Sequence, residues 1–287
     1  MKSILLILII LILLYTLFKL LQKLLSLLRP ITYTITPIVT PATKQINTPQ
    51  KIPRVIYQTM RSSRVPTDMN EAISSWTLLN PEYTHYFYTD EMCRQFIKRH
   101  FNVAVLHAYD HLVPGAFKAD LWRYCVLYKN GGVYADVDMV AVAPLREILN
   151  ATDTFVSVKD RGLSFSGSDF AIYNAFICCT PEHPILKSAI NFVVQSVANN
   201  FYGINSLHPT GPIALGEAIK RSGATDYKLL VHSDKINYVV LNDKKCIYTK
   251  YDGYLSNLND IGVKKRYHDL WATKNIYSKT PSSFYRV

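Results

Sequence analysis

A helical segment that ends in two glycines and leads directly into a strand constrains this chain more than any other stretch. Residues 114–129 have the composition of a helix, and Asn130-Gly131-Gly132 ends it. We expect a strand over residues 133–142, closed by Pro144. A helix joined to a strand in this way is typical of an α/β sheet.

Alternate residues of the expected strand carry carboxylates. Period-two geometry places Tyr134, Asp136 and Asp138 on one face. The other face is apolar and is expected in the core; it carries Val133, Ala135, Val137 and Met139. Two close carboxylates repel each other unless a cation compensates. Hard oxygen ligands suit Mg²⁺ or Mn²⁺, which also bind diphosphate oxygens, so the strand predicts a divalent-metal site.

The sequence around this unit alternates between strand and helix patterns. We expect further strands at 54–58, 83–89, 154–159 and 171–179. We expect helices at 68–79, 90–100, 182–199 and 212–221, the first two capped by Asp68 and Asp90. This alternation predicts an open α/β sheet with helices on both faces, whose ligands bind at the carboxyl edge of the strands.

One block is specific enough to compare with known families. It reads Lys-Ala-Asp-Leu-Trp-Arg-Tyr at 118–124, Leu-Tyr at 127–128 and Gly-Gly-Val-Tyr-Ala-Asp-Val-Asp at 131–138. Weaker matches lie at 52–59, 75–83, 174–184 and 210–212. Over about residues 51–271 the chain resembles the DXD sugar-transferase family. That family includes fungal Golgi initiating α-1,6-mannosyltransferases, inositolphosphoceramide mannosyltransferases and bacterial capsule enzymes.

The resemblance implies a GT-A (Rossmann-like) glycosyltransferase. Such an enzyme moves a hexose, with mannose preferred here, from a nucleotide-diphosphate sugar to a glycan or glycolipid acceptor, with retention of configuration. By matching positions, the implied catalytic residues are Asp120, Arg123 and Asp138. The implied substrate-binding residues are Asp120, Arg123, Tyr134, Asp136, Asn174 and Trp271. The implied cofactor is Mn²⁺ or Mg²⁺, held by Asp136, Asp138 and His268.

The same residues have structural interpretations that remain open. Asp120 and Arg123 lie three apart and could form an exposed helical pair. Tyr134 could pack on the helix, and Asn174 could satisfy strand backbone. His268 and Trp271 could be a surface histidine beside a packed tryptophan.

The chain departs from the family pattern at two positions where the nucleotide base is expected. The usual histidine of the first strand is Tyr57, and the usual tryptophan after it is Met60. These departures leave the identity of the nucleotide open.

Two other functions are compatible with the acidic pair. In haloacid-dehalogenase-like phosphohydrolases a DxD pair follows the first strand, whereas Asp136 and Asp138 follow several elements. A non-enzymatic carbohydrate-binding or scaffold protein on a decayed transferase fold is the other alternative. The intact Asp120 and Arg123 argue against decay.

Residues 1–29 differ in composition from the rest. Residues 4–18 carry no charge, and this apolar run is shorter than the roughly 20 residues of a membrane span. Lys19 and Lys23 can snorkel and extend it. We prefer a single-pass signal anchor; a cleaved signal peptide and an interfacial helix remain open. The resemblance predicts a type II protein of the Golgi or ER, but the flanking basic residues favour a cytoplasmic C-terminal domain, so the membrane side stays open.

The remaining segments divide into a stem and one catalytic domain. Residues 30–50 are rich in Thr and Pro and are expected to stay extended as a spacer. Residues 51–287 form the expected glycosyltransferase domain. The net charge of +11 includes four basic residues in 1–29, which leaves +7 for the rest, suited to an anionic ligand. We expect no nucleic-acid partner, because Lys and Arg do not cluster.

Overall fold

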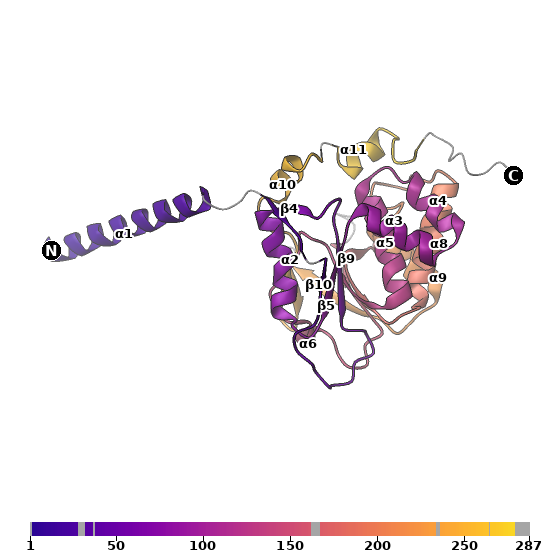
Figure 1. The fold of residues 1–287 in the computed structure, drawn as a ribbon, viewed down its shortest axis with the longest axis horizontal. Coiled ribbons are helices and arrows are strands. Elements are labelled where there is room, and N and C mark those ends of the chain that lie inside the picture. Colours follow the sequence, from indigo (N-terminus) through magenta and orange to yellow (C-terminus); the bar gives the residue numbers. More distant parts are fainter. Residues whose placement is uncertain are drawn as a thin grey trace.

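A mixed β-sheet divides the molecule into two helical layers (Figure 1). The computed structural model describes residues 2–27, 32–36, 38–161, 167–233, 236–263 and 265–278, and their side chains except those of 2–6 and 22–27. Within these ranges the sheet has ten strands. Their spatial order is β2 (Val39–Thr40), β5 (Thr84–Tyr88), β3 (Val55–Thr59), β6 (Gly132–Ala135), β9 (Ile172–Cys179), β8 (Phe155–Lys159), β10 (Lys228–Ser233), β11 (Tyr238–Leu241), β12 (Lys244–Tyr248) and β7 (Val140–Ala141).

The centre of the sheet combines parallel and antiparallel pairs. Strand β3 pairs in parallel with β5 and β6, with Tyr57 opposite Tyr134. Strand β9 runs antiparallel between β6 and β8. The carboxyl ends of β6 and β8 and the amino end of β9 therefore meet at one edge of the sheet. This edge is where ligands of open α/β sheets bind.

Helices cover both faces of the sheet, as the alternating pattern predicts. On one face lie α2 (Thr67–Leu79) and α6 (Leu145–Ile148), where Trp76 stacks on Phe176. The other face carries α3 (Asp90–His100), α4 (Val103–His111), α5 (Gly115–Asn130), α8 (Pro184–Ala198) and α9 (Pro212–Ser222). The C-terminal helices α10 (Tyr254–Asp260) and α11 (Tyr267–Ala272) lie along the upper edge in Figure 1. The predicted α/β architecture is confirmed.

Several local predictions need correction. The strand expected over 133–142 is two strands, β6 and β7, and Asp136 and Asp138 lie in the turn between them, which the Met139 N–H to Asp136 carbonyl bond (3.1 Å) closes. Helix α3 is capped by Thr89, whose hydroxyl accepts from the Met92 N–H, and not by Asp90. Helix α2 begins at Thr67, one residue before the expected cap Asp68, and follows Pro66 without a side-chain cap bond.

The predicted stem does not act as a free spacer where the structure describes it. Strand β1 (Thr32–Thr34) pairs antiparallel with β4 (Arg64–Pro66), and β2 forms the edge of the main sheet beside β5. Ile35 between them is buried in a core cluster with Val65 and Phe87. Extended, Thr-rich segments pair well because β-branched side chains favour strands. Residues 30, 31 and 37 of the stem lie outside the described residues.

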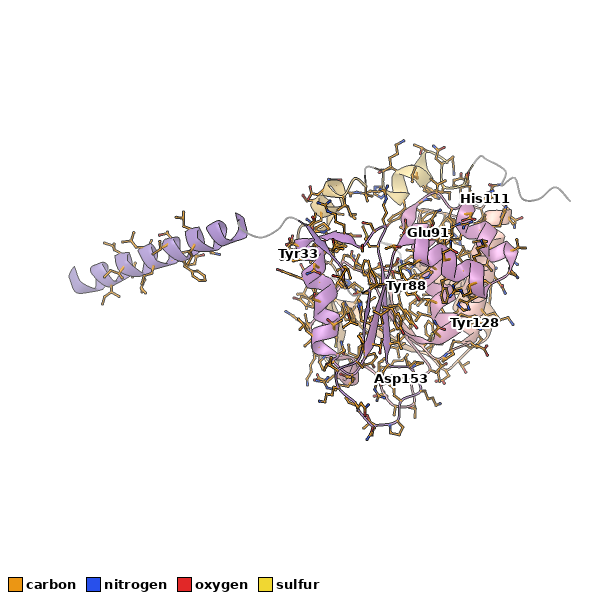
Figure 2. All side chains as sticks on the ribbon, in the orientation of Figure 1. Tyr33, Tyr88, Glu91, His111, Tyr128 and Asp153 are labelled. Atoms are coloured by element: carbon orange, nitrogen blue, oxygen red, sulfur yellow. The ribbon has the colours of Figure 1, made fainter. Side chains whose placement is uncertain are left out.

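The N-terminal segment forms helix α1 (Lys2–Leu27), which stands apart from the sheet and its helices in Figure 1. Its described side chains, at 7–21, point outward all round the helix and are exposed (Figure 2). Residues 1, 28 and 29 of the predicted anchor lie outside the described residues. Over the described ranges, no helix meets the combined length and hydrophobicity required to cross a bilayer.

The glycine pair that ends α5 is held in place by its surroundings. Gly131 has φ +65° and Gly132 has φ +106°. A Cβ on Gly132 would lie 2.8 Å from the Val55 carbonyl oxygen on β3, and one on Gly131 would lie 2.7 Å from Pro181. Glycine is thus required here both for the backbone angle and for the close approach of the helix end to the sheet.

We predict that Gly132→Ala lowers the free energy of unfolding by more than about 3 kcal/mol, because a left-handed conformation alone costs about 1–2 kcal/mol and the Cβ also meets backbone. Urea unfolding measures this loss. The matched control is Gly223→Ala, which has φ +64° but no atom within 4 Å of the added Cβ, so it should cost only about 1–2 kcal/mol. Equal losses in the two variants would contradict the packing argument.

Candidate active site

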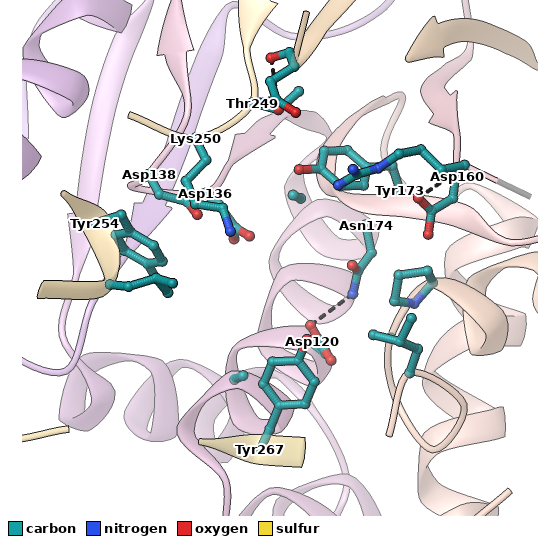
Figure 3. A pocket seen from close by; sticks show the side chains of 18 of the residues that line it. Asp120, Asp136, Asp138, Asp160, Tyr173, Asn174, Thr249, Lys250, Tyr254 and Tyr267 are labelled. Atoms are coloured by element: carbon teal, nitrogen blue, oxygen red, sulfur yellow. Dashed lines mark hydrogen bonds between the residues drawn. The ribbon is translucent and has the colours of Figure 1, made fainter. Parts of the chain in front are cut away.

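A cavity of about 710 Å³ opens at the edge of the sheet where β6 and β8 end (Figure 3). Its walls come from α5, the β6–β7 turn, the start of β9, the loop before α9 and the segment after β12. The polar lining residues among those described include Asp120, Arg123, Asp136, Asp138, Asp160, Arg161, Asn174 and Lys250. Tyr173, Tyr254 and Tyr267 contribute aromatic walls. Together with Asp252, five aspartates line this cavity, but only three cationic side chains do. The lining is therefore acidic, although the whole chain is basic.

The floor of the cavity is a buried ionic cluster centred on Arg123. This guanidinium lies 3.2 Å from Asp120 Oδ1 and 3.2 Å from Asp136 Oδ1, and it donates to the Asn174 carbonyl at 2.8 Å. It also stacks over the Tyr134 ring at 4.3 Å. Only 4% of its side chain is exposed, so every one of these contacts replaces lost hydration. Because α5 lies against β9, the pair is buried and is not the exposed helical pair of the structural interpretation.

Asp120 is held by three partners. Its Oδ1 accepts from Asn174 Nδ2 at 2.8 Å and forms an ion pair with Arg123 at 3.2 Å, and its Oδ2 accepts from the Thr210 hydroxyl at 2.6 Å. Tyr124 joins Thr210 and Asn174 to this network through its own hydroxyl. Burial raises the pKa of Asp120, and the Arg123 charge and the Thr210 hydrogen bond oppose that rise. The network fixes one orientation of the carboxylate at the cavity wall.

The acidic pair lies in the turn after β6. The Tyr134 hydroxyl donates to Asp136 Oδ1 at 2.6 Å, so Tyr134 and Asp136 share a face as period-two geometry predicts. Burial and the Asp136 carboxylate raise the pKa of Asp138 to about 8, although Lys250 acts in the opposite direction. The two carboxylates therefore repel each other, and a bound cation would remove this repulsion.

These residues fit a hard divalent cation that is only partly enclosed by protein. Within the described ranges no group of three or more His, Cys, Asp or Glu side chains is placed to hold a metal. Asp136 and Asp138 would supply two carboxylates. Mg²⁺ sites in phosphate-transferring proteins often use one or two carboxylates and complete their shell with phosphate oxygens and water. The two aspartates therefore suit a metal bound together with a diphosphate.

Two buried polar side chains on neighbouring strands position this turn. Gln58 on β3 donates from Nε2 to the Asp136 carbonyl at 3.4 Å. Its Oε1 faces His85 Nε2 on β5 at 2.9 Å, so that nitrogen carries the proton. Both side chains are buried, and burial lowers the pKa of His85 to about 4. His85 is therefore neutral at physiological pH.

The structure brings together most of the residues that the sequence singles out, but not the C-terminal ones. His268 lies 3.2 Å from Asp269 Oδ1, is half exposed and does not line the cavity. The Trp271 indole N–H donates to the Tyr202 carbonyl at 2.7 Å and also lies outside the lining residues. The assignment of His268 to the metal and of Trp271 to the donor therefore stays a prediction of the sequence. Tyr267 of the same helix is the residue that faces the cavity.

The expected base-contacting position Tyr57 is also placed differently. Its side chain is 4% exposed and stacks on Tyr86 within the core cluster of the α5 face. Met60 packs against the cluster around Ile35 and Val65. Neither residue lines the cavity.

Sequence patterns did not single out several cavity residues, nor the buried Thr210, which supports Asp120 from beneath the lining. Thr210 lies in the Thr-Gly-Pro segment at 210–212, so that match was the available signal for it. Asp160, Tyr173, Lys250, Tyr254 and Tyr267 are single residues without a motif. They reach the cavity only because β8, β9 and the C-terminal segments end at the same edge.

Comparison with known proteins agrees with this geometry. Residues 66–155 match the family model described as "Glycosyltransferase sugar-binding region containing DXD motif". This range holds Asp120, Arg123, Asp136 and Asp138. Over residues 66–155 the chain thus carries the sequence signature of the DXD glycosyltransferases. The resemblance drawn from the sequence motifs is confirmed.

Several curated relatives are similar to this chain. An uncharacterized glycosyltransferase of Acanthamoeba polyphaga mimivirus is 26% identical over 222 residues, which cover 72% of this chain and 82% of the relative. Inositol phosphoceramide mannosyltransferase 1 of Schizosaccharomyces pombe is 29% identical over 147 residues, covering 50% of this chain and 43% of the relative. The initiation-specific alpha-1,6-mannosyltransferase of Candida albicans is 30% identical over 115 residues, 38% of this chain and 30% of the relative. The chain thus spans less than half the length of these two fungal family members.

Among solved structures, the PaToxG glycosyltransferase matches 60% of this chain and 70% of its own, with 15% identity and a TM-score of 0.45. This superposition is too limited to support a conclusion about the site. The family assignment therefore comes from the sequence of the DXD region.

We predict that the neutral His85 makes stability depend on pH. Its folded pKa of about 4 lies below the ordinary value of 6.5, so its contribution is complete above pH 6.5 and is lost as the pH falls towards 4. At pH 4.5 the loss should be about 2.5 kcal/mol. His85→Gln, which keeps a donor for Gln58 but cannot ionise there, should show a shallower fall. Urea unfolding of both proteins at pH 7, 5.5 and 4.5 measures the difference, and parallel profiles would contradict the prediction.

Proposed function

We propose that this chain is a metal-dependent glycosyltransferase that moves a hexose, with mannose preferred, from a nucleotide-diphosphate sugar to a glycan or glycolipid acceptor with retention. The observation that carries the proposal is the arrangement of Asp120, Arg123, Asp136 and Asp138 around one cavity within the DXD family region. The Schizosaccharomyces pombe and Candida albicans relatives are mannosyltransferases, which supports mannose as the sugar. We also propose that the α/β domain is of the GT-A type.

The cavity residues suit the charge changes of sugar transfer. The bond between the anomeric carbon and the phosphate oxygen breaks, and its electron pair leaves with the diphosphate. The acceptor oxygen bonds to the anomeric carbon and its hydroxyl proton is released. Asp120, fixed by Asn174 and Thr210, is placed to accept hydrogen bonds from donor-sugar hydroxyls and to orient the ring. An oriented carboxylate also favours the positive charge that develops on the ring in the transition state.

Arg123 has an organising role in this proposal. Its charge is shared by Asp120 and Asp136, so it holds the two carboxylates in fixed positions relative to each other. Asp136 and Asp138 would hold Mn²⁺ or Mg²⁺. When bound, the metal would supply Lewis-acid stabilisation of the leaving diphosphate. An acidic cavity otherwise repels a diphosphate, which is why the proposal requires a divalent cation.

Membrane attachment through residues 1–29 and a type II placement in the Golgi or ER stay predictions of the sequence. We expect the full chain to stay in the membrane pellet after alkaline carbonate extraction, and a chain beginning at residue 30 to be released. Release of both would contradict the anchor. The shorter chain begins at residue 30 so that it retains β1, β2 and Ile35, which pack on the domain.

For the activity itself, we predict that Asp138→Asn abolishes Mn²⁺-dependent transfer from GDP-mannose, measured as labelled mannose transferred to glycan or glycolipid acceptors. Without metal, the variant should be at least as stable as the wild type in urea, because the amide removes the repulsion with Asp136. In the wild type, Mn²⁺ with a donor at 100 times its Kd should add about 2.7 kcal/mol of stability. The variant should lose this gain.

The matched control is Asp243→Asn, an exposed aspartate outside the cavity, which should keep full activity. Full activity of Asp138→Asn, or of the wild type in EDTA, would contradict a role for the metal in the reaction. The uridine-diphosphate sugars of glucose, galactose and N-acetylglucosamine test the donor in the same assay. Stabilisation by none of the donors would favour the scaffold alternative, and phosphate release without sugar transfer would favour a phosphohydrolase.

A further inference from the structure

The cavity contains a cation whose charge is not committed to a protein partner. Among the described lining residues the cations are Arg123, Arg161 and Lys250. Arg123 is almost fully buried and is bonded to two carboxylates and a backbone carbonyl. Arg161 lies at the end of β8, next to Asp160. Its positive charge opposes the rise in the pKa of Tyr173. Lys250 is exposed, and its ammonium group makes no hydrogen bond or ion pair with the described residues.

Lys250 is directed at the acidic pair. Figure 3 shows its side chain extending towards Asp136 and Asp138. The ammonium charge of Lys250 favours a lower pKa for Asp138, although the two groups form no ion pair within 4 Å. Lys250, Asp136 and Asp138 all line the cavity. A ligand that binds on the two aspartates through a divalent cation would therefore meet Lys250 from the other side.

Backbone bonds on both sides of Lys250 fix this position. The Tyr251 N–H donates to the Asp138 carbonyl at 3.0 Å, which ties the segment after β12 to the acidic turn. The Thr249 N–H and hydroxyl both donate to the Asn237 carbonyl, at 2.9 and 2.8 Å. Only the side chain of Lys250 is free to adapt to a ligand. A lysine on a fixed backbone beside a metal site is well suited to a phosphate group, which it binds as a point charge.

We propose that Lys250 binds the diphosphate of the nucleotide-sugar donor, opposite the metal held by Asp136 and Asp138, and stays on the leaving nucleoside diphosphate. This inference rests on the proposed function and assigns one more residue to its donor site. The diphosphate gains negative charge as the glycosidic bond breaks. Lys250 lies where it adds a positive charge to an otherwise acidic lining.

The test is isothermal titration of the full chain with GDP and UDP, and with GMP and UMP, all in Mn²⁺. Lys250→Gln should bind the diphosphate that the wild type prefers about tenfold more weakly, the loss of one charge-assisted hydrogen bond. The loss for the corresponding monophosphate should be smaller. Lys250→Arg should retain most of the affinity. Lys244→Gln, an exposed lysine of β12 outside the cavity, is the matched control and should bind as the wild type does.

The outcomes of the titration distinguish the role of Lys250 from the proposed function. If the wild type binds a diphosphate and Lys250→Gln binds it equally well, the role of Lys250 is overturned and the proposed function stands. An equal loss for the mono- and diphosphate, or an equal loss in Lys244→Gln, overturns it too, because the lysine then acts only through general charge. If the wild type binds no nucleoside diphosphate in Mn²⁺, the proposed function fails and the inference fails with it. Urea unfolding of each variant excludes a folding defect.

Discussion

The guanidinium of Arg123 is the interaction on which the site depends. It links α5 to the β9 backbone at Asn174 and to the turn that carries Asp136, while Asp120 completes its shell. Removing one partner of such a buried cluster leaves an unpaired charge and commonly costs about 3–5 kcal/mol. The cluster therefore couples folding to function: the same bonds that hold the helix against the sheet hold the two carboxylates in place. The glycine turn at 131–132 allows the close approach of the end of α5 to Val55 of β3 and to Cys179 of β9.

Charge is distributed unevenly, and this changes how the basic composition should be interpreted. The chain carries +11, and +7 remains without residues 1–29. That excess is suited to an anionic ligand. The cavity instead has more carboxylates than cations. Anion binding there would rely on a bound divalent cation and on a few placed cations such as Lys250, rather than on a positive field. Ligand affinity should thus follow the metal concentration more than the ionic strength.

Prediction from sequence succeeded where a pattern is local. The alternation of apolar residues gave Val133, Ala135, Val137 and Met139 as core residues, and all four are buried. The central helix and the flanking elements follow their expected ranges within a few residues.

The strand that was expected to continue to 142 is interrupted, because a turn at Asp136–Met139 satisfies the backbone there. Thr89 competes successfully with Asp90 for the cap of α3. The stem residues pair with the sheet because their β-branched side chains suit an edge strand, which composition alone did not reveal.

The sequence by itself determined the chemistry of the site: which carboxylates and which arginine, their spacing, and their position after a strand of an α/β sheet. It determined this because those residues lie within about twenty positions of one another and are ordered by helix and strand geometry. Only the tertiary structure decided which distant residues join them. Asn174 and Thr210 hold Asp120, and Lys250 and Tyr267 face the same cavity, while His268 and Trp271 do not. The physical reason is that contacts between residues far apart in the chain depend on where whole strands and helices end, and no local pattern encodes that meeting point.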